Sequence, residues 1–254
     1  IEHSLSPKLH NFLIQSYDIK ALYERKKLEE NEIEGIISKI RKEEISGINV
    51  TVPFKQKVIP YLDELSLEAE KTQSVNTICF KNKKLIGHNT DITGFRQSIE
   101  KINFDMENKK IFLLGAGGVV PSIIYALNKM KVSQIKISNR TIEKAENLKN
   151  RFENLEIIKW GDIPEFDVVI NATSLGLKKD EIINIDFSKV GKNKLFYDII
   201  YNPGQTHFLD TGNKLGNKSE NGKLMFIYQG LAAFDLWHGV KPNLTDQIIK
   251  LIAQ

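Results

Sequence analysis

The sequence contains a single cysteine and no long apolar run. Cys79 has no partner in the chain for a disulfide, and its apolar neighbours favour a buried structural thiol. No apolar segment approaches the roughly 18 residues of a membrane helix, and the N-terminus lacks the basic and hydrophobic regions of a signal peptide. We therefore expect a soluble, cytoplasmic protein. Because the chain starts at Ile1 without a methionine, immediately before a motif, we also expect residues upstream of it.

Arginine is scarce, with 5 arginines against 31 lysines at a net charge of +4. The lysines are scattered among glutamates rather than gathered in blocks, which predicts a solvated surface and no nucleic-acid partner. The five histidines are dispersed and form no pair at helical spacing, so no metal site is predicted. A chain of 254 residues, 41% of them hydrophobic, can bury one large core or two modest ones.

The apolar pattern predicts an α/β fold with two domains. The first, residues 1–101, alternates helices and strands, which favours a mainly parallel sheet. Its first predicted helix comes directly after Ser6-Pro7, and further helices are predicted at 29–41, at 66–72 and from about Thr93. One strand is predicted to begin at 21–23, and the others are predicted at 45–52, 76–80 and 84–87. Residues 103–109 are polar and are the expected linker.

The second domain, residues 102–221, begins with a strand at 110–114 that has no polar residue after its first lysine, as in a buried central parallel strand. A glycine turn at 115–118, a helix at 119–129 and a strand at 134–138 complete a βαβ unit. Further strands are expected at 157–159, 167–170 and 195–198, and residues 212–223 are expected to form a surface loop.

The glycine turn predicts a bound nucleotide. A strand, a tight turn and a helix N-terminus place backbone N–H groups against a pyrophosphate, although glycine turns also end ordinary strands. Gly115 and Gly117 occupy the first two positions of the dinucleotide fingerprint. Val120 stands at the third position, so close packing of the helix on the sheet is less assured.

The end of the next strand distinguishes NADP from NAD. An NAD site would have an acidic side chain there for the ribose, whereas this chain has Asn139, Arg140 and Thr141, which can hold a 2′-phosphate. We therefore predict NADP. Asn139 is also expected to cap the helix that continues through Ala145.

Two ionisable residues follow predicted strands in the first domain. Pro53 cannot continue a central strand, so Lys55 lies at a turn, and Asp91 follows a second polar cluster. A lysine and an aspartate at the ends of neighbouring strands can share a proton and act on a carbonyl or an alcohol. The alternative is that Lys55 is a solvated corner residue.

The order and spacing of these motifs resemble the shikimate dehydrogenase family over nearly the whole chain. The matching segments are Ser4-Leu5-Ser6-Pro7 with His10-Asn11, residues 47–55, Val75-Asn76-Thr77, Asn89-Thr90-Asp91, residues 115–118, Asn139-Arg140-Thr141, residues 171–176, Tyr201-Asn202-Pro203, Gln229 and Trp237. The resemblance implies the reversible reduction of 3-dehydroshikimate to shikimate with NADPH, in the route to aromatic amino acids. It also implies a substrate domain, completed by C-terminal helices at 222–254, and a Rossmann-type NADP-binding domain.

The resemblance further implies roles for individual residues. Lys55 and Asp91 would be the catalytic pair, with Lys55 donating a proton to the oxygen. The substrate carboxylate would be held by Ser4 and Ser6, and the ring hydroxyls by Thr51, Asn76, Asp91 and Gln229, with Tyr201 lining the same pocket. The cofactor would contact Gly115, Ala116, Gly117, Gly118, Asn139, Arg140, Thr141, Lys144, Thr173 and Ser174.

The chain departs from the family pattern at several positions, and related functions stay open. Gln73-Ser74 replaces the common Gly-Ala, Val119-Val120-Pro121 replaces small residues and an arginine, and Lys144 replaces a second arginine. A lysine can hold a phosphate as a point charge but not as a bidentate fork. The alternatives are a quinate or amino-shikimate dehydrogenase of the same family and a sensor that binds pathway metabolites without turnover. We expect a monomer or a homodimer.

Overall fold

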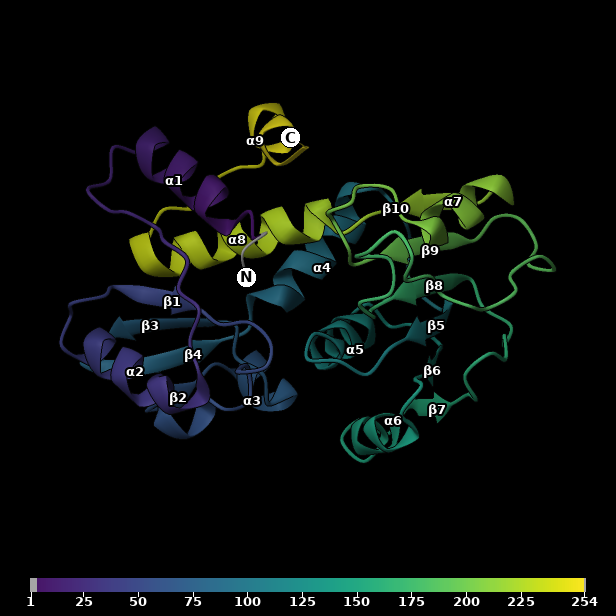
Figure 1. Cartoon of the computed structure of the whole chain (residues 1–254), viewed down its shortest axis with the longest axis horizontal. Coiled ribbons are helices and arrows are strands. Elements are labelled where there is room, and N and C mark those ends of the chain that lie inside the picture. The colour runs from purple at the N-terminus through teal and green to yellow at the C-terminus, as the bar shows by residue number, and fades with distance from the viewer. Residues whose placement is uncertain (1–3, 254) are drawn as a thin grey trace. The chain divides into compact units, whose positions relative to one another are not determined.

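The computed structural model describes residues 4–253, the side chain of Ala253 excepted. They form two compact units: the described residues up to Gln97 together with those from Phe226 onward, and Ser98–Met225 (Figure 1). The boundaries fall inside helices α4 (Thr90–Lys101) and α8 (Lys223–His238). None of the described helices is long and apolar enough to cross a membrane.

The first unit contains a mixed sheet of four strands in the order β1-β3-β4-β2. The strands are β1 (Gly47–Asn49), β2 (Glu64–Leu65), β3 (Thr77–Lys81) and β4 (Lys84–His88). β3 pairs antiparallel with β1 and with β4, and only the β2–β4 pair is parallel. The expectation of a mainly parallel sheet is therefore wrong. Asn82 and Lys83 both have positive φ values, 53° and 63°, and a two-residue turn of this kind joins antiparallel strands.

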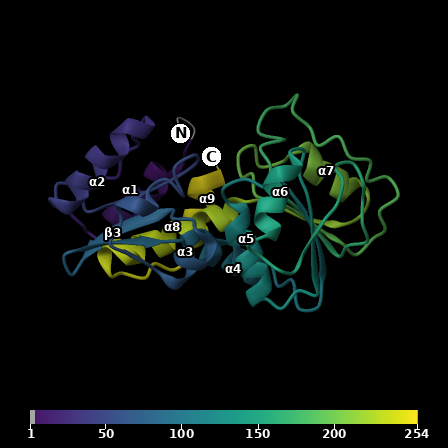
Figure 2. The same cartoon turned by 90° about the horizontal axis from the view of Figure 1, so that it is seen from below.

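Helices α2 (Ile33–Arg41), α3 (Leu67–Thr72) and α8 pack on this sheet, whereas α1 (Ser6–Ser16) packs against α9 (Asp246–Ala253). Single 3₁₀ turns lie at Glu30–Glu32 and Ile59–Tyr61. Isoleucines at helical spacing on α2 are buried in one core with Ile78 and Leu85 of the sheet. Figure 2 shows α2 on one side of the strands and α8 on the other. In α8, the Trp237 indole donates a hydrogen bond to the Ile78 carbonyl (3.0 Å).

The predicted strand beginning at residues 21–23 does not form. The Asn11 side chain on α1 takes the place of a neighbouring strand, because it accepts from the Tyr23 N–H (2.8 Å) and donates to the Tyr23 carbonyl (2.9 Å). Two hydrogen bonds that a ladder would supply thus come from one amide. The predicted strand at 45–52 is shorter than expected and consists of β1 alone.

The second unit contains a parallel sheet of six strands in the order β10-β9-β8-β5-β6-β7. The strands are β5 (Lys110–Leu114), β6 (Gln134–Ser138), β7 (Leu155–Ile157), β8 (Val168–Asn171), β9 (Leu195–Asp198) and β10 (Lys218–Glu220). In chain order this is the 3-2-1-4-5-6 arrangement of a doubly wound dinucleotide-binding fold. The Rossmann-type prediction is confirmed.

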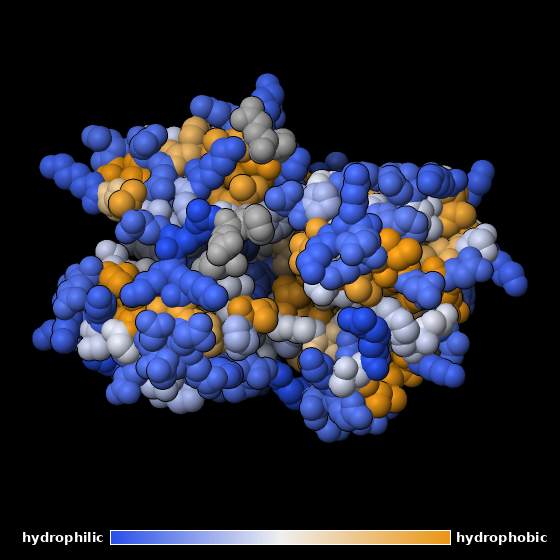
Figure 3. All heavy atoms as spheres, viewed as in Figure 1, coloured by the Kyte–Doolittle hydropathy of each residue, from blue (hydrophilic) through white to orange (hydrophobic). Residues whose placement is uncertain are grey.

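Helices α5 (Val120–Lys129) and α6 (Ile142–Lys149) lie on one side of this sheet, and α7 (His207–Lys214) lies on the other (Figure 2). The predicted surface loop at 212–223 is wrong, because it contains the end of α7 and the edge strand β10. The sequence of β10, Lys-Ser-Glu, has no apolar residue that would reveal a strand. Hydrophilic side chains cover most of the face shown in Figure 3.

Candidate active site

Lys55 and Asp91 lie in direct contact. Lys55 follows the turn after β1, in which the Phe54 N–H bonds the Thr51 carbonyl (2.9 Å), and Asp91 is the second residue of α4. The Lys55 ammonium donates to Asp91 Oδ2 at 2.5 Å, and the two side chains are only 11% and 10% exposed. The positive end of the α4 dipole also favours a carboxylate at this position. The structure therefore holds a buried ion pair between Lys55 and Asp91.

Asn76 fixes the other oxygen of Asp91. Its Nδ2 donates to Asp91 Oδ1 (2.8 Å) and to Thr90 Oγ1 (3.0 Å), and its Oδ1 accepts from the Thr90 N–H (2.8 Å). Both protons of the amide are thus donated within the protein. Asn76 orients the Asp91 carboxylate here, while its predicted bond to a substrate hydroxyl stays a prediction.

The other residues predicted to hold the substrate lie in both units. Ser4 and Ser6, at the start of α1, are joined by their hydroxyls (3.2 Å), and Gln229 on α8 donates to the Phe226 carbonyl (2.8 Å). Thr51 is exposed. Tyr201 belongs to the second unit, three residues after β9. Their contacts with a substrate stay predictions.

The glycine turn fits a closely approaching nucleotide. Gly115 has a φ of 107°, and a Cβ there would lie 2.8 Å from the Ala172 carbonyl oxygen, so this position requires glycine. Gly117 and Gly118 are exposed, and the start of α5 has no side-chain cap. Backbone N–H groups at this helix end can bind a pyrophosphate. Val120, at the third fingerprint position, is fully buried, so the larger side chain is accommodated against the sheet.

The segment after β6 presents the residues predicted to recognise the 2′-phosphate. Arg140, Thr141 and Lys144 are exposed. Thr141, not Asn139, occupies the N-cap position of α6, and the Asn139 side chain donates to the Thr141 carbonyl (2.7 Å). The expectation that Asn139 caps this helix is therefore wrong. Asn139 instead fixes the turn on which Arg140 is carried.

Thr173 and Ser174 lie in a loop that a buried carboxylate anchors. Asn171 Oδ1 accepts from the Thr173 N–H (3.0 Å) and hydroxyl (2.7 Å), and Asn171 Nδ2 donates to Asp198 Oδ1 (3.0 Å). The Thr206 hydroxyl donates to Asp198 Oδ2 (2.7 Å). Burial raises the pKa of the Asp198 carboxyl to about 6. Asp198 is not among the residues predicted from the sequence to form the site. The one sequence signal for it is a carboxylate at the end of an otherwise apolar strand.

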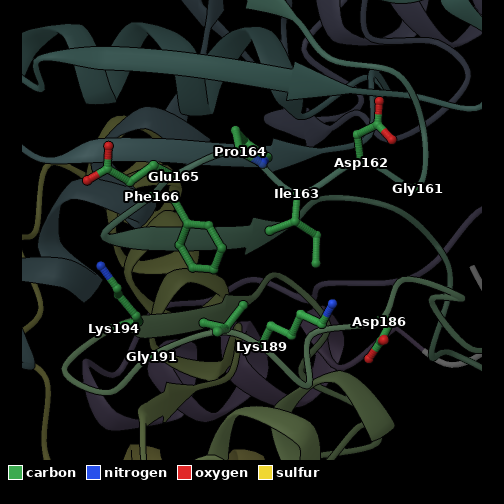
Figure 4. A pocket seen from close by; sticks show the side chains of 11 residues that line it. Gly161, Asp162, Ile163, Pro164, Glu165, Phe166, Asp186, Lys189, Gly191 and Lys194 are labelled. Atoms are coloured by element: carbon green, nitrogen blue, oxygen red, sulfur yellow. The ribbon is translucent and has the colours of Figure 1, made fainter.

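A hollow of about 890 Å³ lies elsewhere in the second unit. Its lining includes Phe166 and Lys194, which precede β8 and β9, whereas the predicted cofactor residues follow strands (Figure 4). None of the predicted site residues lines it. Among residues 4–253, no group of three or more metal-binding side chains is arranged to hold an ion.

Comparisons with known proteins identify the family. Residues 1–78 match the family model described as shikimate dehydrogenase substrate binding domain, and residues 97–201 match the model described as shikimate / quinate 5-dehydrogenase. Shikimate dehydrogenase (NADP(+)) of Pelagibacter ubique is 54% identical over 99% of this chain and 95% of that protein.

Solved structures agree with these matches. The crystal structure of shikimate dehydrogenase from Aquifex aeolicus has a TM-score of 0.90 and 33% identity, covering 100% of this chain and 94% of that one. The Thermus thermophilus enzyme, solved in complex with NADP(H) and shikimate, has a TM-score of 0.90 and 28% identity, covering 99% and 94%. The matched residues, the high sequence identity and the common fold show that this chain belongs to the shikimate dehydrogenase family.

Proposed function

We propose that this protein catalyses the reversible NADPH-dependent reduction of 3-dehydroshikimate to shikimate, a step of aromatic amino-acid biosynthesis. The observation that supports this most directly is the buried contact between Lys55 and Asp91, in a chain that is 54% identical to a shikimate dehydrogenase (NADP(+)). A sensor that binds pathway metabolites without turnover is expected to lose the lysine and the aspartate. The presence of both residues therefore favours an enzyme.

The chemistry follows from the pair. In the reduction, Lys55 donates a proton to the carbonyl oxygen, and its positive charge stabilises the negative charge that develops there. Asp91, fixed by Asn76, keeps the ammonium oriented. In the reverse direction the same lysine accepts the proton of the substrate alcohol.

The cofactor site fits NADP. Gly115, Gly117 and Gly118 leave room for the pyrophosphate beside the start of α5, and Arg140 and Lys144 supply positive charge for the 2′-phosphate. NADPH, when bound, supplies the hydride that reduces the carbonyl carbon. Ala116, Asn139, Thr141, Thr173 and Ser174 complete the proposed contacts.

The substrate contacts are proposed on the same basis. Ser4 and Ser6 hold the carboxylate, and Thr51, Asn76, Asp91 and Gln229 bond the ring hydroxyls, with Tyr201 contacting the same molecule. We also propose a cytoplasmic location, since the single cysteine is free and buried, and a monomer or homodimer. Analytical ultracentrifugation tests the oligomeric state.

The experiment that tests the function is a comparison of initial rates for shikimate and quinate, each with NADP and with NAD. We expect the highest kcat/KM for shikimate with NADP, because Arg140 stands where an NAD site needs a carboxylate. Faster turnover of quinate would identify a quinate dehydrogenase. Binding of shikimate without any turnover would identify a sensor and contradict the proposal.

A further inference from the structure

The loop that follows β8 leaves the sheet directly beside the glycine turn. Ala172 still continues the strand pairing, because its N–H donates to the Leu114 carbonyl (2.8 Å) at the end of β5. A Cβ on Gly115 would lie 2.8 Å from the Ala172 carbonyl oxygen and 3.0 Å from Cγ2 of Thr173. Residues 172 and 173 therefore pack on the turn that is proposed to bind the pyrophosphate.

The strand order places this loop on the side of the turn away from Arg140. Arg140 lies two residues after β6, which pairs with one edge of β5, whereas β8 pairs with the other edge. The chain order reverses between β5 and β8, and dinucleotides bind across such a switch point. A cofactor whose 2′-phosphate meets Arg140 therefore extends its nicotinamide half toward residues 172–174.

Asn171 holds this loop through all four hydrogen bonds that an amide side chain can make. Its Oδ1 accepts from the Thr173 N–H (3.0 Å) and from the Thr173 hydroxyl (2.7 Å). Its Nδ2 donates to the Leu175 carbonyl (3.1 Å) and to Asp198 Oδ1 (3.0 Å). Because Asn171 is fully buried and its amide has no capacity left, its side chain is not itself a ligand contact.

The Thr173 hydroxyl is committed to the loop as well. It gives its only proton to Asn171 Oδ1 and accepts from the Leu175 N–H (3.0 Å). It therefore has no proton left to donate to a cofactor, and the proposed contact of Thr173 with NADP falls to its other groups. The hydroxyl serves to hold the loop closed.

Asp198 anchors the amide in this orientation. An ionised carboxylate only accepts, so Nδ2 of Asn171 faces Asp198 and Oδ1 faces Thr173. The Ile200 N–H donates to the same carboxylate oxygen (3.0 Å), and the Thr206 hydroxyl donates to the other (2.7 Å). Since Thr206 also caps α7, the loop after β8 is joined through two buried side chains to the start of that helix.

We propose that Asn171 is a positioning residue for the nicotinamide half of the cofactor: its amide, anchored on Asp198, sets residues 172–174 against the glycine turn before the cofactor binds. The inference rests on the proposed function, because it takes the glycine turn as the NADP site. A loop that is already fixed loses less freedom on binding than a mobile one. Asn171 therefore acts on cofactor affinity through the loop, and equally with and without a 2′-phosphate.

The test compares wild type with Asn171→Ala by the Kd of NADPH and of NADH, each followed by the fluorescence of the bound nucleotide. We expect both Kd values to rise by the same factor, about tenfold, because the Thr173 N–H and hydroxyl lose their shared acceptor. Thr173→Val keeps the branched shape, removes the hydroxyl and should raise both Kd values about threefold to fivefold. In the Asn171→Ala background it should add less than twofold.

Asn217→Ala is the matched control. Asn217 is also a buried asparagine of the second unit whose amide holds backbone groups, because it accepts from the Lys194 N–H (2.9 Å) and donates to the Gly191 carbonyl (3.1 Å). None of these residues is a predicted cofactor contact. Its loss should lower the free energy of unfolding in urea and leave both Kd values within twofold of wild type.

Kd values of Asn171→Ala within twofold of wild type would overturn the inference, and so would a rise for NADPH alone or an equal rise in Asn217→Ala. If Asn171→Ala does not fold, Thr173→Val decides in the same way, and unchanged Kd values contradict the inference. A wild-type protein that binds NADPH but does not turn over shikimate would instead overturn the proposed function, while the Kd comparison would still decide the role of Asn171.

Discussion

Replacing Lys55 by alanine removes the proposed proton donor and leaves the rest of the site in place. The Lys55 ammonium is 2.5 Å from Asp91 Oδ2, and both side chains are buried. General acid catalysis by a positioned group contributes about 10² to 10⁴ in rate. We therefore expect kcat to fall at least about 10²-fold, which corresponds to about 2.7 kcal/mol of transition-state stabilisation.

The same substitution should change the KM for shikimate much less. We propose that Ser4, Ser6, Thr51 and Gln229 supply most of the substrate contacts. Lys55 acts mainly when negative charge develops on the carbonyl oxygen of the substrate. The substitution also leaves Asp91 without its cation. The Asn76 hydrogen bond and the α4 N-terminus remain, so we expect a loss of folding stability of about 1–3 kcal/mol, less than for a fully buried pair.

Steady-state rates near neutral pH with shikimate and NADP, together with urea unfolding, measure both effects. Lys57→Ala is the control: Lys57 lies two residues further on, is 41% exposed and pairs with the exposed Glu30, so its loss should leave kcat unchanged. If Lys55→Ala keeps kcat within threefold of wild type, Lys55 is a solvated corner residue and the proposed mechanism fails.

Two further predictions concern the second unit. Arg140→Ala should raise the KM for NADP at least about tenfold more than the KM for NAD, because only the 2′-phosphate loses a partner. Steady-state rates with both cofactors test this, and an equal rise of the two KM values would contradict the assignment of NADP. The pKa of the Asp198 carboxyl is raised from its ordinary value of 3.8 to about 6 in the folded protein. The contribution of its proton to folding stability is therefore greatest below about pH 4, and it falls by about 3 kcal/mol as the pH rises past 6. Asp198→Asn should lack this fall, and equal pH slopes of the urea unfolding free energy from pH 4 to 7 would refute the reasoning.

The second unit could be predicted from the sequence more fully than the first, for a physical reason. Strands β5, β6 and β9 have the predicted bounds. β5 and β9 are short, largely apolar runs, as expected of strands buried on both faces, whereas β6 alternates apolar and polar residues. In the first unit, pairing direction depended on the two-residue turn at Asn82, which no apolar pattern reports. The predicted strand near Tyr23 failed because one side chain, Asn11, replaced a partner strand.

The contact between Lys55 and Asp91 was predictable because both residues follow strands of one sheet. The expectation that these strands are neighbours is wrong, since β3 lies between β1 and β4. The contacts that hold Asn76, which orients Asp91, were not predictable: Asn49 Nδ2 donates to the Asn76 carbonyl (3.1 Å), and Thr77 Oγ1 donates to Asn76 Oδ1 (3.1 Å). Asn49 and Thr77 lie within strands, where a polar residue gives no sign of whether it faces water or a buried partner. Only the register between β1 and β3, in which Asn49 lies opposite Thr77, brings the two side chains together.

The two units contain the same hydrogen-bond arrangement around a buried carboxylate, but the donors to that carboxylate differ. In each, an asparagine at or next to the end of a strand donates to a buried carboxylate and accepts from a threonine N–H: Asn76 holds Asp91 and Thr90, and Asn171 holds Asp198 and Thr173. Asp91 also receives the ammonium of Lys55, whereas the hydrogen bonds to Asp198 come from neutral donors, and burial raises the pKa of its carboxyl. An ammonium beside a carboxylate can deliver a proton to a substrate, whereas the neutral groups around Asp198 bind the loop that carries Thr173. The difference in donors is the reason we propose the chemistry for Lys55 and Asp91 and a structural role for Asp198.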